Sequence, residues 1–501
     1  MPTFSAAVVK GIAASGGLYV PDSLPSLSLQ QIARFAEWPY SQRAAEVFKL
    51  LGVDLDEATI QDLMQRSYGP QWSDQRIAPV VSLGSGMHVL ELWHGPTSAF
   101  KDMALQCMPL FFSASVESMR ERGQATDDFL ILVATSGDTG KAALDGFADR
   151  AHIKIAVFYP DQGVSDIQRK QMVTQTGENV NVFGVRGNFD DCQTAIKDAF
   201  ADAPFNTILA DEHGFVLSSA NSINFGRLAP QIVYYISAYA DLLAEGSLNP
   251  GQPMDVCVPT GNFGNILAAY YAKLMGVPIG RLVCASNENR VLADFIETGI
   301  YDIAERDFVT TPSPSMDILV SSNLERLLYH LAGPERVREW SEALRTHGRF
   351  EVDPDTLSQL QEHFCAGWVD NDSALLTIKE VLDESGYLMD PHTAVAWRIA
   401  HAEKSDNPML VVSTAAWAKF GDSVLKAILG VPYSAPLPED YARLGGVGML
   451  KAVQKLTSAS IAPIPDSLAR LEETPERFTA VVDSGHEAVE TAVLDWLRSA
   501  E

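Results

Sequence analysis

The sequence predicts an α/β fold with mostly parallel sheets in two units, preceded by a helical segment. Continuous apolar runs at residues 129–134, 254–258 and 409–412 are typical of strands buried on both faces of a parallel sheet. Segments with apolar residues at helical spacing alternate with these runs. The alternation restarts after a polar break at residues 245–253, which indicates a second unit.

The helical segment is predicted to cover residues 1–85. Its apolar spacing predicts helices at residues 29–35, 44–51 and 57–68. The segment contains no obvious chemistry, and Gly69-Pro70 is one of the breaks that separate it from the sheets.

The first α/β unit is predicted to cover residues 86–245. Its expected strands are residues 87–93, 129–134, 154–158, 179–185 and 215–217. Its expected helices are residues 105–119, 141–148, 166–175 and 190–200, with a long apolar helix after residue 227.

The second unit is predicted to cover residues 246–501. Its expected strands are residues 254–258, 281–285 and 409–412, and residues 266–275 are expected to form a helix. Residues 286–380 are expected to be mostly helical, interrupted by a loop at 310–315 that contains two prolines.

Composition excludes several classes of protein. The formal net charge of -27 argues against a nucleic-acid binder, which needs a basic face. No apolar run approaches the length of a membrane span, and the first residues hold no signal-like stretch. The five cysteines form no C-x-x-C pair and the ten histidines show no ligand spacing, so we expect no metal. We expect a cytoplasmic protein that is a monomer or a weak homodimer.

One lysine lies in an unusual setting. The stretch from His94 to Gln106 joins an expected strand to an expected helix, with Thr97 or Ser98 as the predicted helix cap. Lys101 would then lie at the start of the helix, where its charge opposes the helix dipole. A solvated surface lysine fits this position, and so does a lysine that reacts with carbonyl groups.

Further candidate loops leave the carboxyl ends of expected strands, where ligands bind in such folds. Residues 259–265 place two glycines before a helix, which suits either a phosphate or a tight turn without a ligand. Residues 135–141 fail the nucleotide-binding pattern, because Thr135 replaces its first glycine and Ala142 its final Ser or Thr. A P-loop ATPase is therefore disfavoured.

Two single residues keep two interpretations each. Arg227 begins a helix after a polar run and could clamp an anion or form a structural salt bridge. Thr414 ends a strand and could donate a hydrogen bond to a heteroaromatic nitrogen or merely cap the strand.

Taken together, these motifs resemble the threonine synthase family of fold-type II pyridoxal-phosphate enzymes, which have a tryptophan synthase β-like fold. The resemblance rests on segments between residue 17 and about residue 420, in the family order: 17–21, 94–102, 136–140, 259–265 and 390–395. One departure is that Ala416-Trp417 stands where the family usually has His-Pro, although Lys419 is retained.

The resemblance implies roles for the candidate residues. Lys101 would be the catalytic residue and would hold pyridoxal 5'-phosphate covalently. The cofactor phosphate would be bound by Gly261, Asn262, Phe263 and Asn265, and Thr414 would face the ring nitrogen. The carboxylate and phosphate of the substrate would be bound by Ser136, Asp138, Thr139, Asn221, Ser222, Asn224 and Arg227.

The activity that the resemblance implies is the conversion of O-phospho-L-homoserine and water to L-threonine and phosphate, the last step of threonine biosynthesis. The alternatives are another fold-type II lyase of the serine or threonine dehydratase kind, and a catalytically silent binding protein that resembles threonine synthase. A phosphate-binding or nucleotide-binding protein without pyridoxal phosphate is a third alternative, and it predicts no visible chromophore.

Overall fold

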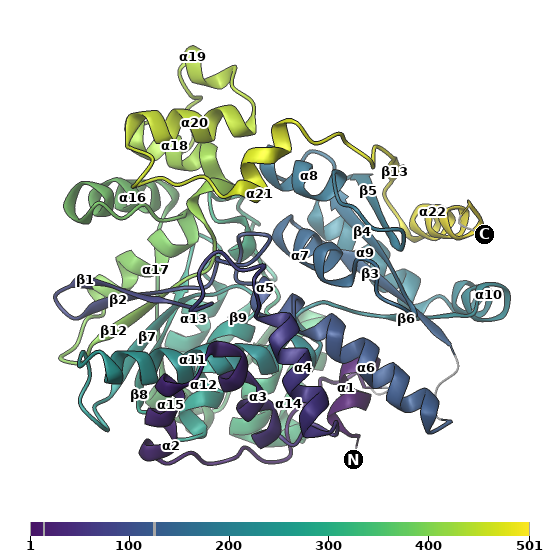
Figure 1. Cartoon of the computed structure of the whole chain (residues 1–501), viewed down its shortest axis with the longest axis horizontal. Helices are drawn as coiled ribbons and strands as arrows, with labels where there is room; N and C mark the ends of the chain where they lie inside the picture. Colours follow the sequence, from purple (N-terminus) through teal and green to yellow (C-terminus); the bar gives the residue numbers. More distant parts are fainter. Residues whose placement is uncertain (1, 14–15, 124–126, 500–501) are drawn as a thin grey trace.

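Two sheets side by side organise the molecule, with α5 (Asp102–Leu105) and α7 (Asp138–Phe147) between them (Figure 1). The computed structural model describes residues 2–13, 16–123 and 127–499. A six-stranded sheet has the order β1-β2-β12-β7-β8-β11, and a five-stranded sheet has the order β13-β5-β4-β3-β6. Only the β1–β2 pairing in these two sheets is antiparallel.

The strands have the following bounds. The six-stranded sheet consists of β1 (Val80–Gly84), β2 (Met87–Glu91), β7 (Met254–Pro259), β8 (Ile279–Ser286), β11 (Phe364–Trp368) and β12 (Met409–Ser413). The five-stranded sheet consists of β3 (Asp128–Ala134), β4 (Ile153–Pro160), β5 (Val180–Arg186), β6 (Phe215–Ser218) and β13 (Val481–Asp483). A small antiparallel pair is formed by β9 (Ile300–Asp302) and β10 (Arg349–Glu351).

The helices of the first half of the chain are α1 (Phe4–Lys10), α2 (Leu29–Arg34), η1 (Phe35–Glu37), α3 (Tyr40–Leu50), α4 (Glu57–Ser67), α6 (Met108–Glu121), α8 (Asp166–Val173), α9 (Phe189–Ala201), α10 (Ala203–His213) and α11 (Phe225–Ala244). Those of the second half are α12 (Gly264–Leu274), α13 (Val291–Thr298), η2 (Pro314–Met316), α14 (Leu324–His347), α15 (Pro354–His363), α16 (Asn371–Ser385), α17 (Pro391–Ala402), η3 (Trp417–Phe420), α18 (Gly421–Leu429), α19 (Glu439–Ala442), α20 (Gly446–Leu456), α21 (Asp466–Ala469), η4 (Arg470–Glu472) and α22 (His486–Ser499).

Both large sheets are buried on two faces, as their apolar strands predict. Along β12, Leu410 shares a core with α3, α11 and α12, whereas the next residue, Val411, shares one with α16, α17 and α18. Along β3, Ile131 packs with α6 and α7, whereas Leu132 packs with α9 and α22. Residues that alternate along one strand therefore enter different cores, as the two-residue period of a strand requires.

Most predicted elements are confirmed within a few residues, and several were missed. The region predicted to be helical up to residue 85 ends in strand β1, and the region 286–380 contains β11, which completes the six-stranded sheet. Helix α10 and the edge strand β13 were not predicted either.

The division at residues 85 and 245 stays a prediction as a division into domains, but sheet membership crosses it. Strand β2, which leads to Lys101, pairs with β12 from the far end of the chain. Strand β13 returns from the C-terminal region to pair with β5. No helix in the described parts of the chain is long and apolar enough to cross a membrane.

Candidate functional site

The loop after β2 delivers Lys101 to the interior. Lys101 occupies the N-cap position of α5, so the predicted place at the start of a helix is confirmed. The predicted caps are wrong, because the Thr97 N–H and hydroxyl instead donate to the Asp102 carboxylate at 2.8 and 2.6 Å. Ser98 has φ +62 and lies outside the helix. Gly95 is required beside them, since a Cβ there would lie 2.5 Å from Asp102 Cβ.

Lys101 is buried rather than solvated. Its Nζ donates to Ser315 Oγ at 3.3 Å and lies 3.9 Å from Asp138 Oδ2. Burial lowers the pKa of Lys101 to about 8, with a further lowering from Arg227 and Lys419, while Asp138 opposes the shift. An amine with this pKa is partly neutral near pH 7.5, which is what a nucleophilic or basic lysine needs.

Asp138, at the start of α7, is held by cations and amides. Its Oδ1 lies 3.0 Å from Lys419 Nζ and accepts from Gln168 Nε2 at 2.9 Å. Burial alone would raise its pKa, but Lys419 and Lys101 hold the pKa of Asp138 well below its usual range. An ionised carboxylate repels anions, so this geometry does not suit Asp138 for the predicted contact with a substrate carboxylate or phosphate.

Its predicted neighbours Ser136 and Thr139 are half-buried at the same end of α7. Thr135, which begins the turn between β3 and α7, uses its hydroxyl to accept from the N–H groups of Gly137 and Gly140 at 2.9 and 2.8 Å. The turn is therefore ordered by its own hydroxyl, and the side chains of Ser136 and Thr139 lie beside Asp138.

The predicted phosphate loop lies at the N-terminus of α12, after β7. Phe263 adopts a left-handed conformation with φ +64, which a bulky residue rarely does outside functional turns. Asn265 Oδ1 accepts from Tyr234 and Tyr235 at 2.8 and 2.5 Å, which fixes the amide. Its Nδ2 is buried and has no hydrogen-bond partner among the described residues. A buried donor left open at a helix N-terminus suits a bound oxyanion.

A segment that the sequence analysis did not select holds this loop in place. Ser321 Oγ donates to the Gly261 carbonyl at 2.7 Å, and Ser322 Oγ donates to Asn262 Oδ1 at 3.0 Å. Asn323 Nδ2 bridges the carbonyls of Asn262 and Ser222 at 3.0 and 3.1 Å. Asn323 thus joins the phosphate loop to the polar run before α11.

The residues of the polar run before α11 differ in whether their side chains are available to a ligand. Asn221 and Ser222 are half-buried next to Asn323, as a ligand loop requires. Asn224 instead caps α11, because its Oδ1 accepts from Gly226 N and its Nδ2 donates to the carbonyls of Val8 and Ser219. Both amide hydrogens of Asn224 are therefore committed within the fold and are not left for a substrate.

Arg227 is the strongest candidate for an anion ligand. It is 3% exposed, its Nη1 donates to the Ala220 carbonyl at 2.7 Å, and its Nε has no partner among the described residues. Burial lowers the pKa of Arg227 to about 10. A structural salt bridge, the other interpretation of this residue, is absent from the described contacts, so an incoming anion would gain a buried cation.

The end of β12 is joined to the lysine loop. The Thr414 carbonyl accepts from Phe100 N at 2.7 Å, and Ala416 N donates to the Ser98 carbonyl at 3.0 Å. Thr414 is buried, and its place facing the ring nitrogen of the cofactor stays a prediction. In the place of the usual His-Pro pair, Trp417 is buried and its indole Nε1 lacks a partner among the described residues.

Ser315 was missed by sequence reasoning, although it lies in the loop that its flanking prolines marked. Its Oγ also lies 3.4 Å from Asp138 Oδ2, and its N–H donates to His392 Nε2 at 3.2 Å. His392 Nδ1 is 2.7 Å from Asp390 Oδ1, which fixes the ring with Nε2 as the acceptor. The motif at residues 390–395 thus acts on the site through Ser315.

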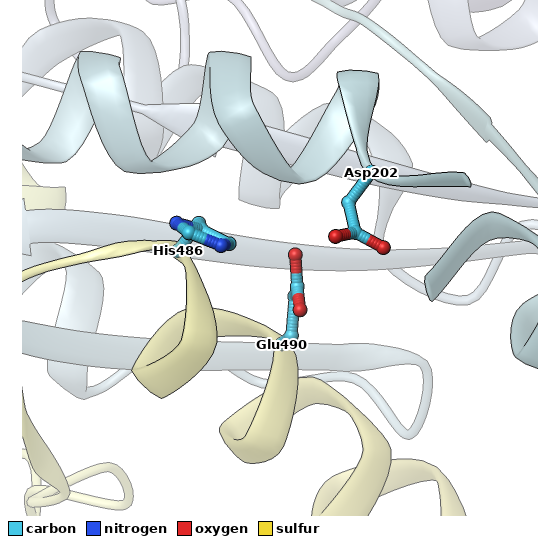
Figure 2. A group of neighbouring side chains, drawn as sticks. All are labelled: Asp202, His486 and Glu490. Carbon is cyan, nitrogen blue, oxygen red and sulfur yellow. The ribbon is translucent and has the colours of Figure 1, made fainter. Parts of the chain in front are cut away.

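Among the residues that the structure describes, one group of side chains, away from this site, has the spacing of metal ligands. Asp202, at the start of α10, faces His486 and Glu490 on α22 (Figure 2). All three are only partly buried, and Asp202 Oδ1 already accepts from Phe205 N at 2.6 Å. The cluster joins α22 to α10 at the far side of the five-stranded sheet, and the predicted absence of a metal stays a prediction.

Comparisons with known proteins agree with this geometry. The family described as "Threonine synthase N terminus" matches residues 2–68, and the family described as "Pyridoxal-phosphate dependent enzyme" matches residues 82–414. A Homo sapiens protein named threonine synthase-like 1 is 43% identical over 85% of this chain, which spans 58% of that relative's length. Threonine synthase of Pseudomonas aeruginosa is 37% identical over 88% of this chain and 90% of its own length.

A solved structure is similar over nearly the whole chain. The crystal structure of pyridoxal-phosphate-bound threonine synthase from Brucella melitensis has a TM-score of 0.83 and 34% sequence identity, covering 99% of this chain and 96% of that one. The similarity includes the N-terminal helical segment as well as both sheets.

Proposed function

The chain belongs to the threonine synthase family of pyridoxal-phosphate-dependent enzymes, and we propose that it converts O-phospho-L-homoserine and water to L-threonine and phosphate. The observation that carries the proposal is a buried lysine of lowered pKa that shares a site with a buried arginine lacking a described carboxylate partner. The first can act as a base, and the second can bind an anionic substrate.

The residues present fit pyridoxal phosphate. The open Nδ2 of Asn265 and the backbone of residues 261–265 would hold its phosphate, Lys101 Nζ would hold it covalently, and the Thr414 hydroxyl would face its ring nitrogen. When bound, this cofactor withdraws electrons from the carbons next to a substrate's amino group.

Lys101 then moves protons. With the substrate bound, the neutral amine of Lys101 would take a proton from the substrate's α-carbon and then one from its β-carbon. The phosphate would leave the γ-carbon, which would regain a proton, and water would supply a hydroxyl to the β-carbon while the α-carbon regains its proton. Ser315 Oγ, 3.3 Å from Nζ, orients the amine between these steps.

Arg227 would hold the substrate. A guanidinium with an unpartnered Nε matches the two oxygens of a carboxylate or phosphate. Asn221 and Ser222 lie in the polar run before α11, Ser136 and Thr139 lie at the start of α7, and these four residues would complete the anion contacts. Because Arg227 is buried, its contact with the anion would form away from water, where it would be stronger. The cytoplasmic location and the monomer or weak homodimer state stay predictions.

The test is to load the purified protein with pyridoxal phosphate, add O-phospho-L-homoserine, and measure phosphate and threonine in one sample. Equal amounts of both would confirm the proposal. Phosphate with 2-oxobutanoate would instead indicate a lyase of the dehydratase kind. Bound chromophore without any phosphate release would indicate a silent relative, and the Trp417 exchange beside Thr414 would be the first place to look for the cause.

A further inference from the structure

Lys419 is fully buried and reaches three separate parts of the site. It lies in η3, just after β12, with 0% of its surface exposed. Its Nζ donates to the Thr97 carbonyl at 2.9 Å and to Gln171 Oε1 at 2.8 Å, and it lies 3.0 Å from Asp138 Oδ1. These partners belong to the lysine loop, α8 and α7, so one ammonium joins the six-stranded side of the molecule to the five-stranded side.

Asp138 lies between two lysines at unequal distances. Lys419 Nζ is 3.0 Å from Oδ1, whereas Lys101 Nζ is 3.9 Å from Oδ2 and donates to Ser315 Oγ instead. Gln168 Nε2 also donates to Oδ1 at 2.9 Å. The carboxylate is therefore already neutralised on its Lys419 side, and Lys101 is left without a close ionic partner.

We propose, on the basis of the function proposed above, that Lys419 is a positioning residue for Lys101: by pairing with Asp138 it prevents that carboxylate from drawing Lys101 Nζ into an ion pair. Without Lys419, Asp138 would remain in the buried site with Lys101 as its nearest cation. The amine would then move from Ser315 toward Asp138 and would be protonated more of the time.

The charges around Lys101 determine the direction of the effect. Asp138 on α7 and Asp102 on α5 favour the ammonium form, whereas Arg227 on α11 and Lys419 disfavour it, in addition to the dominant effect of burial. Removing Lys419 deletes one opposing cation and frees one carboxylate, and both changes favour the ammonium. An opposite charge at this range shifts a pKa enough to change the neutral fraction by about tenfold or more.

The experiment uses full-length, cofactor-free protein. Trace labelling with acetic anhydride across pH 6–10, followed by peptide mass spectrometry, gives the titration midpoint of Lys101. Lys419→Met should raise that midpoint and lower the labelling rate at pH 7.5 about tenfold. Lys419→Arg, which keeps the charge, should restore most of the rate. Lys141→Met is the matched control, because Lys141 is another largely buried lysine, 3.5 Å from Asp145, and should leave the midpoint unchanged.

An unchanged midpoint in folded Lys419→Met protein would overturn the proposal, as would an equal shift in Lys141→Met. If Lys419→Met does not fold, Asp138→Asn provides the test, because removing the carboxylate should lower the titration midpoint of Lys101. An unchanged midpoint would show that Asp138 does not influence Lys101, and it would overturn the proposal. Labelling needs neither substrate nor turnover, so a protein that makes no threonine still tests this inference.

Discussion

Lys101 Nζ is held in a buried site by one hydroxyl, with carboxylate oxygen no nearer than 3.9 Å in the contacts described. That arrangement keeps a usable fraction of neutral amine, because a close ion pair would stabilise the ammonium instead. The reactivity of the residue thus depends on distances set by α7, η2 and η3 as much as on its own loop.

Replacing Lys101 with Ala should abolish threonine formation, with a loss of at least about 10³-fold, because it removes the proposed base and covalent anchor. Phosphate and threonine release by the loaded protein measure it. Lys451→Ala, which removes an exposed lysine paired with Glu472, should keep the wild-type rate. Near-normal activity in the Lys101→Ala protein would contradict the assignment.

Arg227→Met should raise KM for O-phospho-L-homoserine about 10- to 100-fold, because a charge-assisted hydrogen bond to the substrate is lost. Arg227→Lys should fall between the two proteins, since an ammonium keeps the charge but not the paired donors. Initial rates over a range of substrate concentrations give both constants. Arg306→Met, which removes a partly buried arginine bonded to Asp294, is the control, and an equal effect there would point to general destabilisation.

The candidate site residues that were predicted from the sequence alone share one property. Lys101, Asn265 and Arg227 each lie in a local strand–turn–helix or loop–helix pattern that is visible within a dozen residues. Ser315, Asn323 and Lys419 act on the site from segments more than two hundred residues away from Lys101. No local pattern shows such contacts, and the short region around Ser315 was marked only by its prolines.

Among the elements, α5 and α7 set the distance between Lys101 and Asp138. Lys101 precedes α5, Asp138 begins α7, and the two helices contact each other. Gly146 on α7 allows the contact, because a Cβ there would overlap the Leu105 carbonyl oxygen and lie 3.0 Å from Pro109 Cγ. Backbone cannot give way as a flexible side chain does, so the two helices would have to separate.

Gly146→Ala should therefore lower the free energy of unfolding by about 1–3 kcal/mol, which is the usual cost of an overpacked core. It should also reduce activity, because Asp138 would move relative to Lys101. Melting temperature and turnover are measured on the same preparation. Gly445→Ala is the control, since a Cβ there meets only Asp166 Oδ2 at 4.0 Å. A Gly146→Ala protein with unchanged stability and turnover would show that the helices have room to adjust.

The strands that were missed are short, and pairing with distant strands decides their conformation. Strand β11, with the sequence FCAGW, is mostly only partly buried and pairs with β8, and β13 has three residues. Gly367 interrupts the apolar residues of β11, none of which is β-branched, and β13 is too short for a pattern, so their strand conformation follows from an open sheet edge elsewhere in the chain. Long buried strands such as β3, β7 and β12 contain a continuous apolar run in their own sequence, and those strands were predicted.

At the scale of the whole molecule, the chain returns on itself at both sheets. Strand β2 pairs with β12, β13 pairs with β5, and α22 packs against α9. A linear division of the sequence cannot predict such returns, because sheet membership is decided by contacts between distant segments. The site forms where these returns bring the lysine loop, α7 and η3 together.

The same burial that tunes the site makes stability depend on pH. Burial raises the pKa of Asp102 to about 7 and that of Asp317 to about 6, against ordinary values near 4. Between about pH 4 and these values each of these two carboxyls binds more protons in the folded protein than in the unfolded chain, so its contribution to stability falls as pH rises. Burial lowers the pKa of His88, His330 and His363, and these histidines contribute in the opposite direction. Asp138 acts in the opposite sense, but its stabilisation is already complete above its ordinary pKa and adds no slope near neutrality.

We therefore expect the melting temperature of the wild type to fall relative to that of Asp102→Asn as pH rises from 5 to 7.5. Asp102 can account for up to about 1.4 kcal/mol per pH unit in this window. Asparagine can keep both contacts, since its oxygen can accept from Thr97 N and its amide can donate to the Thr97 hydroxyl. Asp62→Asn, at an exposed helical pair with Arg66, should keep the wild-type slope of melting temperature against pH.

The net charge of -27 also makes the folded protein more stable at acidic pH, but it acts almost equally on all three proteins. A difference in slope between them therefore isolates the buried carboxyl. Equal slopes in wild type and Asp102→Asn would show that Asp102 does not titrate in this range.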